Sequence, residues 1–362
     1  MSPRTARLVL GVAAPLLALV AAFAITSLVL LLAGDPVGLV WSTILSVPEP
    51  RNIANIINSA TVLYLSGLAV AVGFRMNLFN IGVDGQYRIA AFAAAVVAGE
   101  GWLPGALNVV LTVAAAVLVG AAWAGIAGVL RATRGVSEVI STIMLNFIST
   151  SLVAYFLRRV AVREEGSNIV ATREIPESSR IPGIPLGSGP GAEVYGFVVV
   201  AVLAGIGYWF LLNRTRFGFD LRATGQSATA AVASGINVKR MTVAAMLVSG
   251  GVAGLVGLPI LFGDAYSYGS TFQSGLGFAG IAIALLGRNH PVGIALGALL
   301  FAFLDEQSNP LQILADVSPD IVAITQGVIV LTVVISYEVV RRYRLRLEQQ
   351  QVAQQLAEQV PA

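Results

Sequence analysis

The chain has few charged residues for its length. Of its 362 residues, only 11% are Asp, Glu, Lys or Arg, whereas 56% are hydrophobic, and the mean hydropathy is +0.82. Soluble globular domains carry about 25% charged residues, so this composition excludes that class and predicts a polytopic protein of the lipid bilayer. The apolar content is enough for roughly ten spans of about 20 residues each.

The absence of cysteine and the near absence of histidine and lysine exclude several kinds of catalytic and metal site. The sequence has no cysteine and one histidine, His290, which excludes disulfides, a thiol nucleophile and two-histidine metal sites such as HExxH. The single lysine lies in Val238-Lys239-Arg240 and does not follow a glycine, so the sequence has no Walker A loop. We therefore expect neither enzymatic activity nor a cofactor in this chain. If ATP and magnesium drive its function, a partner chain uses them.

The net charge of +3 gives no reason to expect a nucleic-acid partner. The arginines flank apolar runs and do not gather into a patch with interleaved aromatic residues, as a nucleic-acid surface would require.

Apolar runs separated by glycine, proline and charged residues predict an all-α membrane protein with about ten transmembrane helices. The first run is longer than the roughly 7–15-residue core of a signal peptide, so we expect an uncleaved first span. The predicted spans are 8–33, 53–73, 88–99, 104–130, 137–157, 193–212, 241–262, 275–287, 291–304 and 320–339.

The arginine distribution predicts that both termini are cytoplasmic. With the amino terminus inside, 16 of the 22 basic residues fall in inner segments, as the positive-inside rule requires. This orientation gives a transmembrane domain over 1–340 and a cytoplasmic tail at 341–362. It places the polar segment 158–192 outside and the polar segment 213–240 inside.

The predicted spans divide into two sets of five, which predicts inverted five-helix repeats. The third and eighth spans are short, and each follows a glycine-rich stretch, at 77–86 and at 274–277. Paired, glycine-interrupted segments indicate a transporter's binding site. Irregular backbone at membrane depth also needs protein or a water-filled cavity to satisfy it.

Polar residues within or beside the apolar runs indicate a translocation pathway. Ionisable side chains are costly against lipid, so they are expected to face the inside of a bundle. In the fifth span the polar positions recur at steps of three and four and share one helix face. Hydrogen bonding between helices is the alternative role, and Asp84 and Glu138 also suit interfacial caps. The candidate pathway residues are Asn80, Asp84, Gln86, Glu138, Ser141 and Asn146.

Small residues at every fourth position predict close helix packing. Gly120, Ala124 and Gly128 follow this spacing in one predicted span, and Gly250 and Gly254 follow it in another. Such stripes let helix backbones approach each other and indicate a bundle rather than a substrate site.

The inner segment 213–240 predicts a short surface helix. Ser227 suits its N-cap and Gly235 suits its C-terminal stop. Ala228, Ala231 and Val232 would give it a small apolar face. A short helix of small residues flanked by arginines suits docking into a groove on another protein, and an ordinary amphipathic connector is the alternative.

Three segments resemble one known family. Phe74–Gln86 resembles its FRxGLFNIGxEGQ motif, Glu138–Phe147 its EVISTIMLNYI motif, and Thr215–Val238 its cytoplasmic coupling loop. The family comprises the permease subunits of ABC importers for nucleosides and simple sugars, within the branched-chain amino acid/ribose permease superfamily. The chain departs from it in two ways: Asp84 stands in place of Glu, and Gln226–Thr229 replaces a more charged stretch.

The resemblance implies a type II ABC importer permease fold and import of nucleosides across the bacterial cytoplasmic membrane. It implies a second permease subunit, an ATP-binding cassette ATPase below, and an extracytoplasmic substrate-binding lipoprotein above, which the 158–192 loop would touch. Ribose- or galactose-type sugars and branched-chain amino acids are alternative substrates, and a secondary transporter with inverted repeats is the alternative mechanism. The implied coupling residues are Arg222, Gly225, Ser227, Ala230, Ala231 and Gly235.

Overall fold

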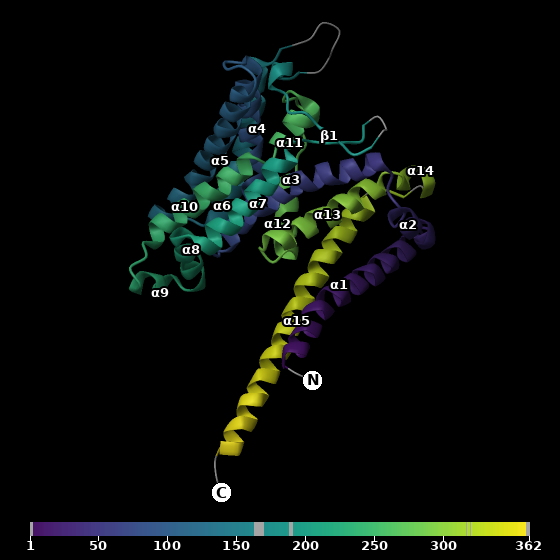
Figure 1. Ribbon diagram of the computed structural model, residues 1–362, viewed down its shortest axis with the longest axis vertical. Helices are drawn as coiled ribbons and strands as arrows, with labels where there is room; N and C mark the ends of the chain where they lie inside the picture. The colour runs from purple at the N-terminus through teal and green to yellow at the C-terminus, as the bar shows by residue number, and fades with distance from the viewer. Residues whose placement is uncertain (1–2, 163–169, 188–190, 316, 319, 360–362) are drawn as a thin grey trace. The chain divides into compact units, whose positions relative to one another are not determined.

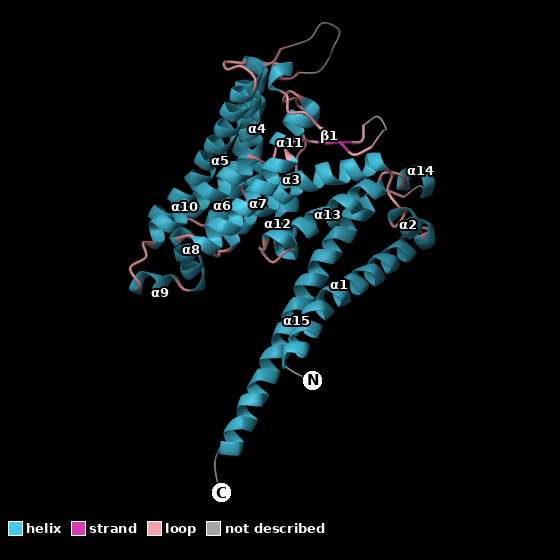
Figure 2. Ribbon diagram, in the orientation of Figure 1, coloured by secondary structure: helices cyan, strands magenta, loops and turns pink. Residues whose placement is uncertain are grey.

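The computed structural model is almost entirely helical (Figures 1 and 2). It describes residues 3–162, 170–187, 191–315, 317–318 and 320–359. The chain forms two compact units, Met1–Val47 with Gln307–Ala362, and Pro48–Glu306.

The larger unit carries most of the helices. Their bounds are α3 (Pro50–Phe74), α4 (Val83–Glu100), α5 (Ala106–Arg134), α6 (Glu138–Val160), α7 (Val198–Arg214), α8 (Arg216–Gln226), α9 (Ala228–Ala233), α10 (Val238–Gly254), α11 (Leu258–Ile260), α12 (Leu276–Leu286) and nearly all of α13 (Pro291–Ser308). Between α6 and α7 lie a 3₁₀ turn, η1 (Glu177–Ser179), and a small antiparallel pair, β1 (Ile184–Pro185) and β2 (Glu193–Val194). A π-helical turn, η2 (Leu261–Ala265), follows α11.

The smaller unit consists of α1 (Pro3–Ala33), α2 (Val37–Ile44), α14 (Leu311–Ala315) and α15 (Asp320–Gln359). Helices α1 and α15 pack against each other. Helix α15 continues from the last predicted span through most of the predicted tail, as far as Gln359.

Each predicted span coincides with a helix, but the helices differ in length. Among the described residues, five are long and apolar enough to cross a membrane, and the bent pair α7 and α8 would make a sixth. Helix α12 and the apolar part of α1, Leu19–Ala33, are shorter. The multi-span, helical architecture is therefore confirmed, and the ten-span topology with inverted repeats stays a prediction.

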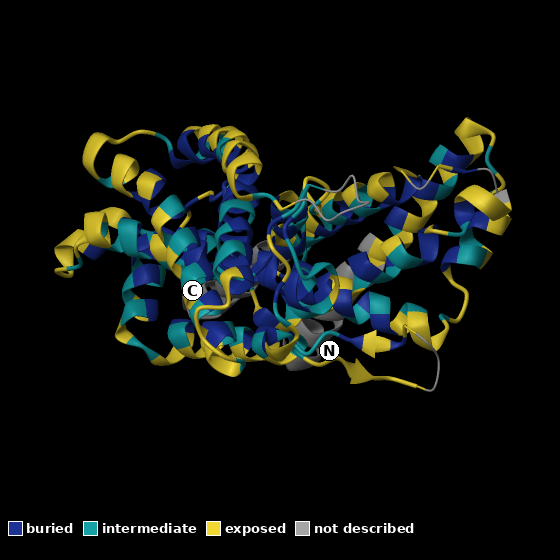
Figure 3. Cartoon of the chain, turned by 90° about the horizontal axis from the view of Figure 1, so that it is seen from above, coloured by how far each residue is buried: buried dark blue, intermediate teal, exposed yellow. Residues whose placement is uncertain are grey.

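Helices α3 and α10 form the centre of the larger unit. In α3, 83% of the apolar span is buried, and in the segment that begins with α10 the share is 72%, against 28% in α5 and 33% in α6. The outer helices present long exposed stretches (Figure 3), many of them apolar. Such exposed apolar faces suit contact with lipid or with other membrane helices.

The predicted glycine stripes hold α5 against α10. A Cβ atom added at Gly120 would overlap the carbonyl oxygen of Gly250, and one added at Gly254 would overlap that of Ala116. The two backbones are thus in direct contact, which confirms the packing role predicted for these glycines.

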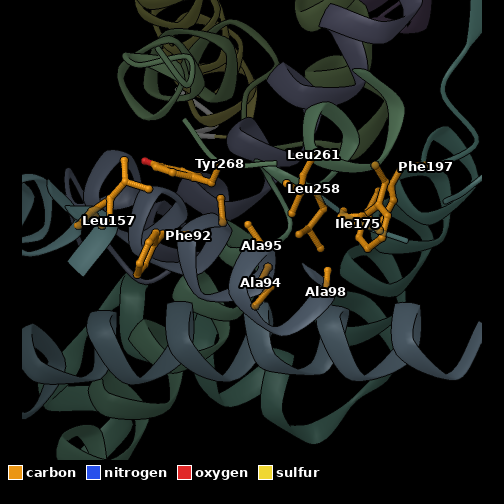
Figure 4. Packing of buried hydrophobic residues seen from close by; sticks show 14 residues of the cluster. Phe92, Ala94, Ala95, Ala98, Leu157, Ile175, Phe197, Leu258, Leu261 and Tyr268 are labelled. Atoms are coloured by element: carbon orange, nitrogen blue, oxygen red, sulfur yellow. The ribbon is translucent and has the colours of Figure 1, made fainter. Parts of the chain in front are cut away.

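The remaining core gathers around α4. One buried cluster runs from Phe92, Leu157 and Tyr268 at one end to Ile175 and Phe197 at the other (Figure 4). It joins α4 and α6 to the segment that follows η2, and this arrangement positions the cavity described below.

Candidate functional site

The backbone breaks between α3 and α4, and the intervening residues 75–82 turn back into the protein. The N–H of Phe79 lies 3.4 Å from Glu138 Oε1 at the start of α6, whereas the N–H of Gly85 donates to Asn146 Oδ1 at 2.9 Å. At about 1.5 Å per residue, Asn146 lies roughly 12 Å further along α6 than Glu138. Helix α4 therefore begins well inside the helical bundle.

Two amides stabilise the end of this break. Asn80 and Gln86 exchange hydrogen bonds of 2.9 and 2.8 Å, and Asn80 Oδ1 also accepts from the N–H of Gly82. Asn80 Nδ2 donates to Ser249 Oγ of α10 at 2.8 Å, and Ser249 donates to the carbonyl of Ala69 in α3. The break is thereby fixed to both central helices.

The predicted polar face of α6 supports the same break. Besides accepting from Gly85, Asn146 donates through Nδ2 to the carbonyl of Ile81 at 3.0 Å. Glu138 pairs with Arg131 of α5 at 3.3 Å. Ser141 donates to the carbonyl of Ser137, one turn back, and makes no side-chain contact with the break among the hydrogen bonds of the described residues.

Asp84 joins the two glycine-rich stretches to which the sequence pointed. Its Oδ1 accepts from the N–H of Gly275 at 2.9 Å and lies 3.4 Å from that of Gly277, at the amino end of α12. A Cβ at Gly277 would overlap the backbone of Asp84, so the starts of α4 and α12 are in contact. The carboxylate lies where the partial positive charge of a helix start favours an anion.

All six candidate pathway residues are thus buried, and all but Ser141 make hydrogen bonds at the break or at the starts of α4 and α12. Their exposed fractions range from 1% for Asn80 and Gln86 to 9% for Asn146. Much of their hydrogen-bonding capacity is used within the chain, which is the stabilising role that the sequence left as the alternative.

The predicted surface helix is present as α9. Ser227 Oγ accepts from the N–H of Ala230 at 3.2 Å, as an N-cap does, and Gly235 ends the helix at φ +81°. These two assignments are confirmed. Ala230 and Val232 are exposed, whereas Ala231 is only 2% exposed and faces its own chain. In Figure 1, α9 lies at the end of the larger unit where α10 begins.

Helix α8 connects α9 to the α3–α4 break. Gly225 packs so closely on this segment that a Cβ atom would lie 2.5 Å from the carbonyl oxygen of Arg75. The Gly225 carbonyl accepts from Asn77 Nδ2 at 2.7 Å. One turn earlier in α8, Arg222 donates to the carbonyl of Leu212 in α7. Arg222 and Gly225, both half-buried, therefore help to hold α8 in place.

A cavity of about 250 Å³ lies beyond the break, between α4, the second half of α6 and the segment 268–272. Its polar lining includes Arg88 and Thr150, and its aromatic lining is Tyr268 and Phe272. None of these four is among the residues that the sequence singled out as candidates. The predicted span 88–99 put Arg88 at the inner boundary, but α4 begins at Val83 and Arg88 lies within the helix.

A second cavity, of about 530 Å³, lies between α3, α7 and α13. Thr61, Tyr64 and His290 are among its few polar side chains, and aliphatic residues form most of its wall. It offers few groups that would orient a polar ligand.

Comparison with known proteins gives the family. Residues 52–335 match the family model described as "Branched-chain amino acid transport system / permease component". The chain belongs to this family. The resemblance found in three motifs is thus confirmed, and the permease is a membrane component of transport systems rather than a catalytic subunit.

Two relatives match this chain over nearly its whole length, and a third matches about two thirds of it. It is 33% identical to the guanosine ABC transporter permease protein NupP of Bacillus subtilis, over 90% of this chain and 93% of NupP. It is 31% identical to the glucose ABC transporter permease protein TsgB13 of Haloferax volcanii, over 94% of this chain and 92% of that protein. A second guanosine permease protein of Bacillus subtilis, NupQ, is 29% identical over 69% of this chain and 80% of NupQ.

Proposed function

We propose that this chain is the membrane-spanning permease subunit of an ATP-driven ABC importer that carries nucleosides across the bacterial cytoplasmic membrane. The observation that carries the proposal is the exposed helix α9, which α8 connects to the broken backbone between α3 and α4 through Gly225 and Asn77. A partner that moves α9 would therefore act on the interior of the bundle.

The proposed coupling proceeds by direct contacts. An ATPase that binds the exposed side of α9, around Ala230 and Val232, would displace α8 during its ATP cycle. The Asn77–Gly225 bond would transmit this motion to residues 75–82, and Asn80 and Asn146 would transmit it to α4, α6 and α10. Two arrangements of these packed elements would give the alternating access that import requires.

We propose that the six buried polar residues lie beside the translocation route and keep its backbone in shape. Irregular backbone at membrane depth is stable only where protein groups or a water-filled cavity satisfy it, and Asn80, Gln86 and Asn146 supply such groups. Asp84 joins the starts of α4 and α12. Two helix starts that meet in this way are what an inverted five-helix repeat would produce around a central site.

Three protein partners complete the proposed importer: an ATPase, a second permease and an extracytoplasmic substrate-binding lipoprotein. A heterodimer of permeases is supported by the similarity of this chain to two different guanosine permease proteins of one organism. The exposed apolar side of α6, which includes Met144, Phe147 and Ile148, is suited to the second permease or to lipid. Both termini would be cytoplasmic, as the arginine distribution predicts.

The substrate class rests on similarity to the guanosine permease proteins. Sugars are a second candidate, because a glucose permease protein is similar over a comparable length. A nucleoside contains both an aromatic base and a sugar, so competition between ligands separates the two candidates.

The test is uptake of radiolabelled guanosine into proteoliposomes that contain this chain, its companion permease, the ATPase and the binding protein. We expect uptake that needs ATP, is blocked by vanadate and is reduced by unlabelled uridine but not by glucose or leucine. If glucose or leucine alone competes, the assignment as an ABC permease stands and the nucleoside assignment is wrong. Vanadate-insensitive uptake driven by a proton or sodium gradient would overturn the ATP-driven mechanism.

A further inference from the structure

The cavity beside Arg88 has the chemistry of a ligand site, and its position along the helices indicates from which side it fills. Its α6 wall runs from Thr150 to Arg158. At about 1.5 Å per residue, these positions lie roughly 18 and 30 Å from the start of α6 at Glu138. The hydrocarbon core is about 30 Å thick. Glu138 and α9 lie at one of its surfaces, so the cavity occupies the half of the membrane nearer the other surface. With cytoplasmic termini, this is the outer half.

One wall of the cavity is aromatic. The rings of Tyr268 and Phe272 stack with centroids 4.5 Å apart and an interplanar angle of 21°. Phe92 packs against Tyr268 from below in a T-shaped arrangement, with ring centroids 5.7 Å apart (Figure 4), so the pair is held in a fixed orientation. Aromatic rings of this kind bind a planar base by stacking.

The opposite wall presents a guanidinium group with hydrogen-bonding capacity to spare. Arg88 donates through Nη1 to Thr150 Oγ1 at 2.9 Å, and its Nε lies 3.7 Å from Asp84 Oδ2. The Nε atom is buried and has no hydrogen-bond acceptor among the described residues. The Arg88 side chain is nevertheless 20% exposed and lines the cavity, so its guanidinium can donate to a carbonyl, ring nitrogen or hydroxyl of a ligand there.

Charge and size restrict the ligand further. Arg88 and Arg158 both line the cavity and disfavour a cation, and Asp84 balances part of the charge of Arg88. The volume of about 250 Å³ is below the roughly 300–1,000 Å³ of sites for drug-sized ligands, so it takes one small molecule. A neutral aromatic heterocycle that carries a hydroxylated ring meets these conditions.

We propose that this cavity is the site at which an imported nucleoside first binds the permease, with its base against Phe272 and Tyr268 and its polar edge toward Arg88 and Thr150. The direction of entry and the ligand class rest on the proposed function. The site also adjoins the outer loop, because Thr172 exchanges hydrogen bonds of 3.0 Å with the backbone of Tyr268. A binding protein that moves this loop would move the aromatic wall.

The first test uses the absence of native cysteine. Ala154 lines the cavity and is exposed, so we expect the thiol introduced by Ala154→Cys to react with a membrane-impermeant reagent added to the outside of cells that express the complex. Saturating guanosine should slow this reaction severalfold. The matched control, Ser178→Cys, lies in the exposed part of the outer loop away from the cavity lining, and guanosine should not change its rate.

The second test separates binding from folding and from turnover. Because stacking on an aromatic residue is worth roughly 1–3 kcal/mol per base, Phe272→Leu should raise the KM for guanosine uptake by at least about fivefold. Arg88→Lys, which keeps the charge but loses the forked donor, should also raise KM. Phe210→Leu changes an exposed phenylalanine of α7 and should leave KM unchanged. Equal amounts of complex and equal ATPase activity would show that the variants fold.

The outcomes distinguish the site from the function. If the complex imports guanosine, but guanosine does not protect the Ala154→Cys variant and Phe272→Leu leaves KM unchanged, the proposed site is wrong and the proposed function stands. If glucose protects the Ala154→Cys variant and guanosine does not, the cavity binds substrate and the nucleoside assignment is wrong. Equal protection of the Ala154→Cys variant and the control would also overturn the site, because the effect would then be a general change of conformation.

Discussion

Asn146 shows how one side chain can stabilise a broken span. Its carbonyl oxygen accepts from the N–H of Gly85 and its amide nitrogen donates to the carbonyl of Ile81, so both backbone groups at the start of α4 have partners. A Cβ on Gly85 would lie 2.8 Å from Asn146 Cα, so the two elements are also in close packing contact. Asn146 therefore acts on the shape of the backbone.

We expect Asn146→Leu to destabilise the permease by about 1–3 kcal/mol, because it leaves the backbone groups of Gly85 and Ile81 buried without partners. Thermal unfolding of the detergent-solubilised complex would measure this loss. The control is Asn213→Leu, since exposed Asn213 donates to a carbonyl of its own helix. Equal melting temperatures for the two variants would contradict the supporting role of Asn146.

At the scale of elements, glycine determines which helices can touch. Gly120 lies on the face of α5 that meets α10, whereas Gly207 of α7 has no atom of the described residues within 4 Å of where a Cβ would be. The same methyl group therefore has opposite consequences at the two positions.

Gly120→Ala should lower the melting temperature of the complex, since the added methyl overlaps the Gly250 carbonyl and forces α5 and α10 apart. Gly207→Ala should be neutral or slightly stabilising, because alanine favours a helix by about 1 kcal/mol over glycine. A melting temperature unchanged by Gly120→Ala would mean that the two helices are not in backbone contact.

The coupling candidates in α8 and α9 include both buried and exposed residues. Gly225 and Ala231 pack on their own chain, so bulky substitutions there would disturb the permease itself. Val232, which is 62% exposed, is the better probe of a docking surface.

We predict that Val232→Arg abolishes most ATP-driven uptake without lowering the melting temperature of the permease, because a long cation on α9 would prevent close docking of the ATPase. Co-purification of the ATPase should fall in parallel. Val136→Arg places the same side chain at an exposed position between α5 and α6 and should leave uptake unchanged. Normal uptake by the Val232 variant would remove α9 from the proposed coupling surface.

For the whole molecule, the decisive property is orientation in the membrane. The outer half assigned to the cavity and the inner side assigned to α9 both follow from the proposed cytoplasmic termini. Within the larger unit, the Arg88 cavity and α9 lie near opposite ends of α6, so we expect them at opposite surfaces of the membrane.

Two single-cysteine variants, one expected on each side of the membrane, would measure this orientation. In intact cells, an impermeant thiol reagent should label Ser178→Cys, and it should label Val232→Cys only after the membrane is opened. Both positions are exposed in the structure. The reverse pattern would invert the topology and would place the Arg88 cavity on the cytoplasmic side.

Much of the architecture and part of the site could be predicted from sequence because the signals are local. Apolar runs located the helices, Ser227 and Gly235 marked the ends of α9, and small residues at every fourth position marked the packing faces of α5 and α10. The motif at 74–86 located the break itself. Each of these features depends on residues within a few helical turns of one another.

The tertiary structure decided what depends on residues far apart in the chain. Asp84 and Gly275 become hydrogen-bond partners across 191 positions. Arg88 lines the same cavity as Tyr268 and Phe272 only because α4, α6 and the segment after η2 pack together. Hydropathy alone put Arg88 at a membrane surface, since the start of α4 is too polar to read as part of a span. By itself the sequence determined the family, the approximate positions of the helices and the ends of α9, which follow from local preference and burial. Packing determined which polar groups satisfy one another and which enclose a cavity, because hydrogen bonds and voids depend on distances between elements.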